Sequence, residues 1–256
     1  MGPNAVRCRV EAGVATITLD KPETKNSLSI PEMVEVGVAV RRAASAGARC
    51  ILITGVGDAF CAGRDLKGVN LDEDDTYELL AREINPALKV VRECEVPTIA
   101  SVAGPALGFG FGLALACDLT IAADNAIFGS PFRKIGLLPD SGAHYYLRER
   151  LGRHRAAELI MTGRMLSGRQ AAELGLINRS CGAEELHAVT AKLARDIAHG
   201  PTRAFGLSKR ILDSGDSYTD MAELEAVSQH EAINGSDGRE GVRAFQEKRA
   251  PRFIGN

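Results

Sequence analysis

The chain has 256 residues, of which 45% are hydrophobic and 25% are charged, and its formal net charge is -2. This composition is typical of a globular protein with a substantial core, and the near-neutral charge gives no long-range attraction for nucleic acid or an anionic membrane. No apolar run approaches the roughly 20 residues of a membrane span, and no signal-peptide core is visible. We therefore expect a cytoplasmic protein, or one inside an organelle, that binds neither nucleic acid nor membrane.

The first half of the chain alternates predicted strands with predicted helices. Runs of apolar and β-branched residues predict strands at 14–20, 49–55, 97–104 and 117–124. A helix follows the first strand, with Ser29 as its N-cap and Pro31 in its first turn. Helical spacing also marks 72–94, where Pro86 predicts a break or kink, and a short helix is predicted at 111–116. This alternation indicates parallel β/α crossovers and an α/β fold.

From about residue 140 the pattern becomes helical. Helices are predicted within 153–163, 167–175, 184–198, 201–213, 220–233 and 239–249. Because the sequence contains no linker or repeat, we expect one domain, with a core at 1–195 and a helical extension of the same domain at 196–256.

The cysteines and histidines give no sign of a metal site. The six cysteines form no C-x-x-C pair, and most lie among apolar residues, which favours reduced, buried thiols. The five histidines are scattered and form no H-E-x-x-H motif. We therefore expect no protein-bound metal.

Two glycine-containing loops, at 55–68 and 104–116, each follow a predicted strand. A dinucleotide-binding G-x-G-x-x-G starting at Gly108 would need glycine at position 113, where Leu113 stands, and no P-loop motif occurs. Both loops could be simple tight turns. Two backbone N–H groups from separate turns, one of them at a helix N-terminus, could instead stabilise a developing oxyanion.

Four ordered stretches resemble the crotonase, or enoyl-CoA hydratase/isomerase, superfamily. They are "ITGVGDAFCAGRDL", "VPTIASVAGPALGFGFGLALACDLTIAADNAIFG", "IGLLPDSG" and "MTGRMLSGRQAAELGLIN", and the ending "GVRAFQEKRAPRF" is also similar. The resemblance implies a spiral of β-β-α turns with a C-terminal helical trimerisation region, in a homotrimer or a dimer of trimers. It also implies an acyl-CoA thioester substrate, with coenzyme A as part of the substrate and no separate cofactor.

The resemblance assigns roles to several residues. The backbone N–H groups of Arg64 and Phe109 would form the oxyanion hole, provided that the Phe109 side chain points away from the thioester. Three further residues would lie along coenzyme A, namely Ala62, Leu66 and Lys67. The two glutamates of the family's hydratases correspond to Gly112 and Phe132 here, so that the usual route of water addition lacks both carboxylates.

Asp140 has two interpretations. It could be the N-cap of the helix that follows. It also corresponds to the acidic position of superfamily members that lack the glutamates, among them dienoyl-CoA isomerases, the phenylacetate-pathway ring-epoxide isomerase and halobenzoyl-CoA dehalogenases. We expect Asp140 to be the general acid/base, with an apolar surround that raises its pKa, supplied by Phe109, Phe132, Ile135, Leu137 and Leu138. His144, one turn later, could face the same site.

The leading functional prediction is therefore an enoyl-CoA isomerase, resembling most in its motifs the ring-epoxide isomerase, with a place in fatty acid or aromatic acid metabolism. A hydratase with a rearranged acid and a non-catalytic coenzyme A binder are the alternatives. A dehalogenase would need a histidine ahead of the strand at 97–104, and all five histidines follow it. The arginines at 147–155 could bind RNA, although a solvated or subunit-facing helix pair explains them better.

Overall fold

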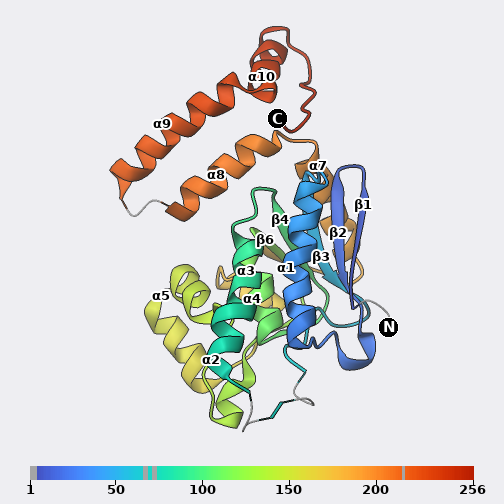
Figure 1. Ribbon diagram of the computed structural model, residues 1–256, viewed down its shortest axis with the longest axis vertical. Helices are drawn as coiled ribbons and strands as arrows, with labels where there is room; N and C mark the ends of the chain where they lie inside the picture. The colour runs from blue at the N-terminus through green and yellow to red at the C-terminus, as the bar shows by residue number, and fades with distance from the viewer. Residues whose placement is uncertain (1–4, 66–68, 71–73, 215–216) are drawn as a thin grey trace.

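The computed structural model describes residues 5–65, 69–70, 74–214 and 217–256. Its centre is a six-stranded sheet with helices on both faces, and three C-terminal helices extend away from one end of that sheet (Figure 1). The four predicted strands and the α/β class are confirmed.

The large sheet has the strand order β1-β2-β3-β4-β6-β9. Its strands are β1 (Val6–Glu11), β2 (Val14–Leu19), β3 (Cys50–Gly55), β4 (Thr98–Val102), β6 (Leu119–Ala123) and β9 (Arg179–Cys181). The first pair forms an antiparallel hairpin, whose turn residues Ala12 and Gly13 both have positive φ. All later pairs in this sheet are parallel. The predicted crossovers are therefore confirmed, and the carboxyl ends of β2, β3, β4 and β6 share one edge of the sheet.

A smaller sheet lies beside that edge. It contains β5 (Pro105–Leu107), β7 (Ile127–Gly129) and β8 (Leu166–Ser167) in the order β5-β7-β8. These strands have two or three residues each, too few for a hydrophobic pattern, and were not predicted from the sequence. Strand β9 and the exposed strand β1, where only Val6 is buried, were not predicted either.

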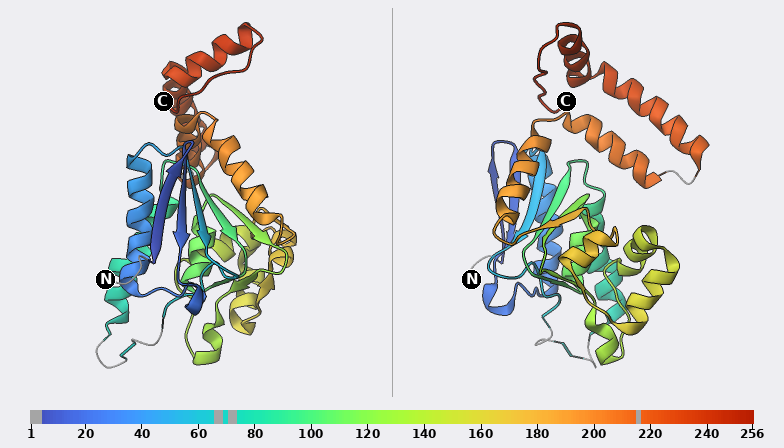
Figure 2. Two further views of the ribbon diagram at one scale, coloured as in Figure 1. Left: turned by 90° about the vertical axis from the view of Figure 1, so that its right-hand side faces the viewer. Right: turned by 180° about the vertical axis from the view of Figure 1, so that it is seen from behind.

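Helices cover both faces of the large sheet (Figure 2). On one face lie α1 (Ile30–Ser45), α3 (Asn85–Arg92) and α4 (Phe109–Ala116), and on the other lie α6 (Gly168–Glu173) and α7 (Leu186–Ala198). The predicted start of α1 is confirmed, because Glu32 accepts hydrogen bonds from the backbone N–H and the hydroxyl of Ser29.

The helix around Pro86 continues instead of breaking. It runs through α2 (Thr76–Glu78), a π-helical segment (Leu79–Ile84) and α3, with Pro86 in the first turn of α3. Proline lacks an N–H and crowds the preceding turn, and the wider π-helical turn accommodates it.

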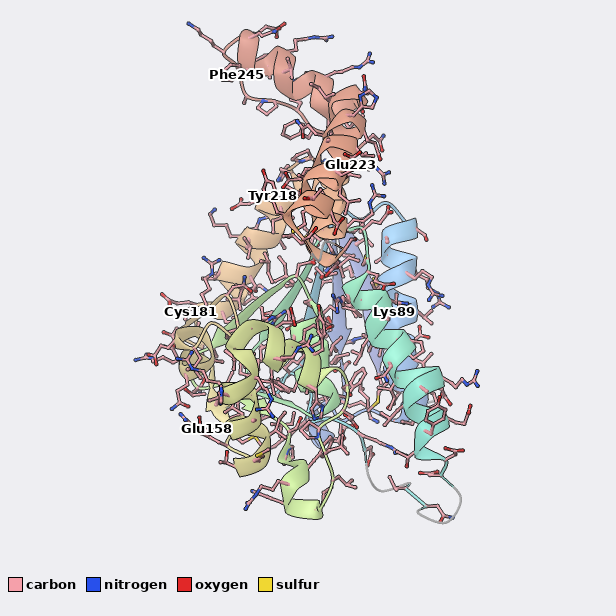
Figure 3. The ribbon with its side chains drawn as sticks, turned by 90° about the vertical axis from the view of Figure 1, so that its left-hand side faces the viewer. Lys89, Glu158, Cys181, Tyr218, Glu223 and Phe245 are labelled. Carbon is pink, nitrogen blue, oxygen red and sulfur yellow. The ribbon has the colours of Figure 1, made fainter. Side chains whose placement is uncertain are left out.

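The remaining long helices are α5 (Ala143–Thr162), which bends at Gly152, and the C-terminal helices α8 (Thr202–Ser214), α9 (Tyr218–Asn234) and α10 (Ser236–Gln246). Figure 3 shows Tyr218, Glu223 and Phe245 on the projecting arm, far from Lys89 of α3 and Glu158 of α5. Within this arm α9 packs between α8 and α10. The side chains of Tyr218 and Phe245 are 88% and 86% exposed. The predicted boundary at residues 195/196 falls in the last turn of α7. The predicted role of the arm in trimer formation stays a prediction.

Polar contacts tie the arm to the sheet domain. Arg49 donates hydrogen bonds to the carbonyl oxygens of Gly200 and Phe253, and Lys209 of α8 pairs with Asp118 at 2.7 Å. Within the described ranges, no helix has the length and apolar character that crossing a membrane requires.

Candidate active site

The two glycine loops of the sequence lie against each other. Cys61 of the first loop pairs with Ala106 of the second, and the N–H of Leu107 donates to the carbonyl oxygen of Cys61 at 2.9 Å. Gly63 has a φ of +102°, and a Cβ atom there would lie 2.9 Å from the carbonyl oxygen of Leu107. Glycine is therefore required at Gly63 both by its backbone conformation and by the close approach of the second loop.

The N–H of Arg64 points away from the segment at Leu28, whose backbone hydrogen-bonds to the residues on either side of Arg64. Gly63 accepts a hydrogen bond from Leu28, and Asp65 donates one back to Leu28, both at 2.9 Å. Because neighbouring N–H groups of an extended chain point in opposite directions, that of Arg64 points to the other side. In the described part of the chain it has no hydrogen-bond acceptor.

The N–H of Phe109 lies at the start of α4, directly after the second loop. The N–H groups of a first helical turn have no acceptor within the helix, and the helix dipole places partial positive charge there. No acceptor for the Phe109 N–H occurs among residues 5–65, 69–70, 74–214 and 217–256. The Phe109 side chain is 3% exposed and belongs to the hydrophobic core, and its orientation away from a bound thioester stays a prediction.

Asp140 is held beside α4 by the residue that follows it. A Cβ atom on Gly112 would lie 2.1 Å from the carbonyl oxygen of Ser141 and 2.7 Å from its Cβ. Gly112 is one helical turn after Phe109, so the segment with Asp140 packs close to the helix start. The predicted acid and the two predicted N–H donors therefore come from neighbouring segments of one region.

The environment of Asp140 favours its protonated form. Burial raises the pKa of the Asp140 carboxyl, and the hydrogen bond from Ser141 and the charges of Arg64 and His144 oppose this only in part. A carboxyl group with a raised pKa is suited to taking up and returning a proton.

The helix-cap interpretation of Asp140 is wrong. The N-cap of α5 is Gly142, and no side chain caps it. The Asp140 carboxylate instead accepts a hydrogen bond from the Ser141 hydroxyl at 2.9 Å. Ser141 could not be identified from the sequence, because a serine beside a carboxylate is common and only its packing on Gly112 distinguishes it.

The predicted apolar surround of Asp140 stays a prediction, although the structure shows how exposed its members are. A Cβ atom on Gly108 would lie 3.3 Å from the Phe132 ring, which places that ring over the second loop. Three other members of the set, Ile135, Leu137 and Leu138, are 57%, 62% and 70% exposed in the single chain.

Two charged side chains accompany the site. The Arg64 guanidinium pairs with Asp74 at 2.9 Å and is partly buried. His144 lies exposed in the first turn of α5 and acts on Asp140 through its charge. The pairing of Arg64 with Asp74 could not be foreseen, because nothing in the sequence marks the partner.

Of the residues predicted along coenzyme A, Ala62 is half-buried in the first loop, and its N–H donates to the carbonyl oxygen of Lys25 at 2.9 Å. Leu66 and Lys67 lie outside the described residues. No group of three or more histidine, cysteine or acidic side chains that could hold a metal ion occurs within the described ranges.

The site can stabilise a negative charge and move a proton. The two N–H groups can donate to an oxyanion, and Asp140 can carry the proton. At Gly112, one of the two positions that the resemblance matches to the hydratase glutamates, the backbone of Ser141 leaves no room for a side chain. The other matched position is Phe132.

Comparisons with known proteins give one family and several relatives that match nearly the whole chain. The family described as Enoyl-CoA hydratase/isomerase matches residues 9–256. A "Probable enoyl-CoA hydratase" of Rhodobacter capsulatus is 37% identical over 262 residues, covering all of both chains. The 1,2-epoxyphenylacetyl-CoA isomerase of Escherichia coli is 37% identical over 253 residues, covering 96% of this chain and 97% of its own. The crystal structure of an enoyl-CoA hydratase from Bacillus anthracis superimposes with a TM-score of 0.91 at 30% identity, covering 98% of this chain and all of the other.

Proposed function

The chain belongs to the enoyl-CoA hydratase/isomerase family of the crotonase superfamily, and we propose that it is an enoyl-CoA isomerase acting through Asp140. The family resemblance and the crotonase fold predicted from the sequence are confirmed. The family acts on acyl-CoA thioesters, so coenzyme A enters as part of the substrate.

In the proposed reaction, the thioester oxygen of a 3-enoyl-CoA accepts hydrogen bonds from the N–H groups of Arg64 and Phe109. The Asp140 carboxylate removes a proton from C2, and the electron pair of the broken C–H bond moves into the thioester to form an enolate. The protonated Asp140 then returns the same proton to C4, which moves the double bond into conjugation with the thioester. Fixed backbone donors stabilise the enolate without reorganising during the reaction.

The packing of Ser141 on Gly112 carries this proposal. It leaves no room for a glutamate side chain at position 112 and brings Asp140 close to the same helix turn, so that we assign the proton transfer to Asp140 alone. Proton transfer from one carbon to another needs only one such group, whereas activation of water and protonation of carbon are usually divided between two. The relationship to an isomerase that acts on a coenzyme A thioester supports the same choice.

Further parts of the proposal follow from the family. Ala62, Leu66 and Lys67 lie along coenzyme A, and no other cofactor takes part. The arm of α8, α9 and α10 joins subunits into a homotrimer or a dimer of trimers. A place in fatty acid or aromatic acid metabolism fits both kinds of relative.

A hydratase with a rearranged acid is the second candidate, because a relative of equal identity is named as a probable hydratase. Purified protein would be mixed separately with a 3-enoyl-CoA and with crotonyl-CoA while the absorbance of the conjugated thioester is followed. An isomerase gives a rise with the first and no loss with the second. Loss of the crotonyl-CoA signal would establish hydration instead, and silence in both would favour a coenzyme A binder.

The acid is tested by Asp140→Asn, which keeps the shape of the side chain but cannot carry the proton. We expect the rate with the 3-enoyl-CoA to fall by about 100-fold or more. Asp196→Asn is the matched control, since Asp196 lies on α7 and pairs with Lys192 at 2.5 Å. Full turnover by a folded Asp140→Asn variant would refute the assignment.

A further inference from the structure

Ser141 has a backbone conformation that a serine rarely adopts. Its φ is +55°, in the left-handed region, and the residue is 3% exposed. For a residue with a Cβ atom this conformation is strained, so that the surrounding structure must hold it.

The contacts around Ser141 explain how this conformation is kept. The N–H of Ala143 donates to the carbonyl oxygen of Asp140 at 3.0 Å, and Gly142 follows with a φ of +79°, so the chain turns sharply between them. On its other side Ser141 rests on Gly112, where its carbonyl oxygen occupies the place of a side chain. Ser141 therefore has a fixed position between α4 and the start of α5.

From this position the Ser141 hydroxyl reaches the carboxylate beside it. Its Oγ donates to Oδ1 of Asp140 at 2.9 Å, and it is the one side chain in the described ranges that hydrogen-bonds to that carboxylate. A hydroxyl that donates to a carboxylate forms a charge-assisted bond, which fixes the orientation of the carboxylate and favours its ionised form.

We propose that Ser141 is a positioning residue for Asp140. Its hydroxyl donates a hydrogen bond to Oδ1 and thereby orients the carboxylate so that Oδ2 faces the substrate carbon. This proposal rests on the proposed role of Asp140 as the acid/base. The hydroxyl supports the ionised carboxylate before it takes the proton, and the contact with Gly112 keeps both residues in place. The Asp140 carboxyl also receives a hydrogen bond from its own backbone N–H, and the charges of Arg64, from the first loop, and His144, from α5, act on it.

Ser141→Gly and Ser141→Ala test the proposal together. Glycine adopts a φ of +55° without strain, so Ser141→Gly removes the hydroxyl and keeps the fold, whereas Ser141→Ala removes the hydroxyl and keeps the strain. We expect kcat with the 3-enoyl-CoA to fall about tenfold in both variants, with KM changed by less than about twofold. The acid limb of the kcat/KM profile should move to higher pH, because the ionised carboxylate has lost its hydrogen-bond donor.

A purely structural role predicts a different result. If only the backbone conformation of Ser141 mattered, Ser141→Gly would keep the wild-type kcat and the wild-type pH profile, and that outcome would overturn the proposal.

A measurement without substrate separates the two proposals. The carboxyl carbon of Asp140 can be titrated by NMR in the unliganded protein, with its signal assigned from its loss in Asp140→Asn. If this titration moves to higher pH in Ser141→Gly while no variant converts the 3-enoyl-CoA, the positioning by Ser141 stands and the isomerase proposal fails. If the enzyme isomerises its substrate but Asp140 titrates identically with and without the hydroxyl, the positioning proposal fails alone.

Discussion

Gly112→Ala tests the contact on which the site geometry depends. The added Cβ atom would lie 2.1 Å from the carbonyl oxygen of Ser141 and 3.0 Å from its carbonyl carbon, whereas real Cβ contacts of this kind exceed 3.0 Å. Those atoms belong to the backbone and cannot rotate away, so α4 or the segment around Ser141 must shift. Overpacking of this kind costs about 1–3 kcal/mol, and helix propensity returns about 1 kcal/mol.

We expect a net loss of up to about 2 kcal/mol in the free energy of unfolding for Gly112→Ala. Urea unfolding followed by far-UV circular dichroism, at one protein concentration for all variants, measures this loss. We also expect kcat to fall under conditions in which the variant remains folded, because the displaced Ser141 carries Asp140 with it.

Gly241→Ala is the matched control. Gly241 also lies inside a helix, α10, but a Cβ atom there would make only ordinary contacts with the Phe253 ring, at 3.5 and 3.7 Å. The same substitution should therefore stabilise this helix, by up to about 1 kcal/mol. The reasoning is refuted if Gly112→Ala is as stable as Gly241→Ala and turns over at the wild-type rate.

Two further predictions concern stability. Asp118→Ala should lower the free energy of unfolding by about 3 kcal/mol, because Oδ2 of Asp118 accepts from the N–H and hydroxyl of Thr98 and pairs with Lys209, which is 13% exposed. Adding Lys209→Met to Asp118→Ala should recover part of that loss in urea unfolding. A loss below about 0.5 kcal/mol in Asp118→Ala alone would contradict the role of the pair. Burial raises the pKa of Asp140, so the folded protein binds the proton of this carboxyl more tightly than the unfolded chain does. The resulting stabilisation is fully present below about pH 4, the ordinary pKa of aspartate, and it is lost as the pH rises through the folded-state pKa. Because asparagine stays neutral, the melting temperature of Asp140→Asn relative to wild type should be higher at pH 7 than at pH 4, and a difference independent of pH would count against the buried carboxyl.

The sequence by itself determined the elements whose residues interact locally or repeat regularly. The β-branched runs at β2, β3, β4 and β6 predicted buried parallel strands, and Ser29 with Pro31 predicted the start of α1. The ordered motifs also determined the family, since they extend over nearly the whole chain. Local patterns sufficed here because a strand or helix of normal length buries one face or both, which leaves a periodic record in the residues.

Other features depended on residues far apart in the chain. The short strands β5, β7, β8 and β9 exist because neighbouring segments pair with them. At Pro86, where proline predicted a break or kink, a π-helical turn keeps the helix continuous. The exposure of Leu137 and Leu138 was equally invisible in an apolar stretch of sequence.

Tertiary structure also decided between the two interpretations of Asp140. Its sequence context suits a helix cap, but the packing of Ser141 on Gly112 turns the chain so that Gly142 takes the cap position. Asp140 is left partly buried and close to the start of α4, and its carboxylate accepts a hydrogen bond from the Ser141 hydroxyl. The sequence named the carboxylate, whereas its raised pKa and its orientation arise from long-range packing, because burial and close approach are properties of the folded chain.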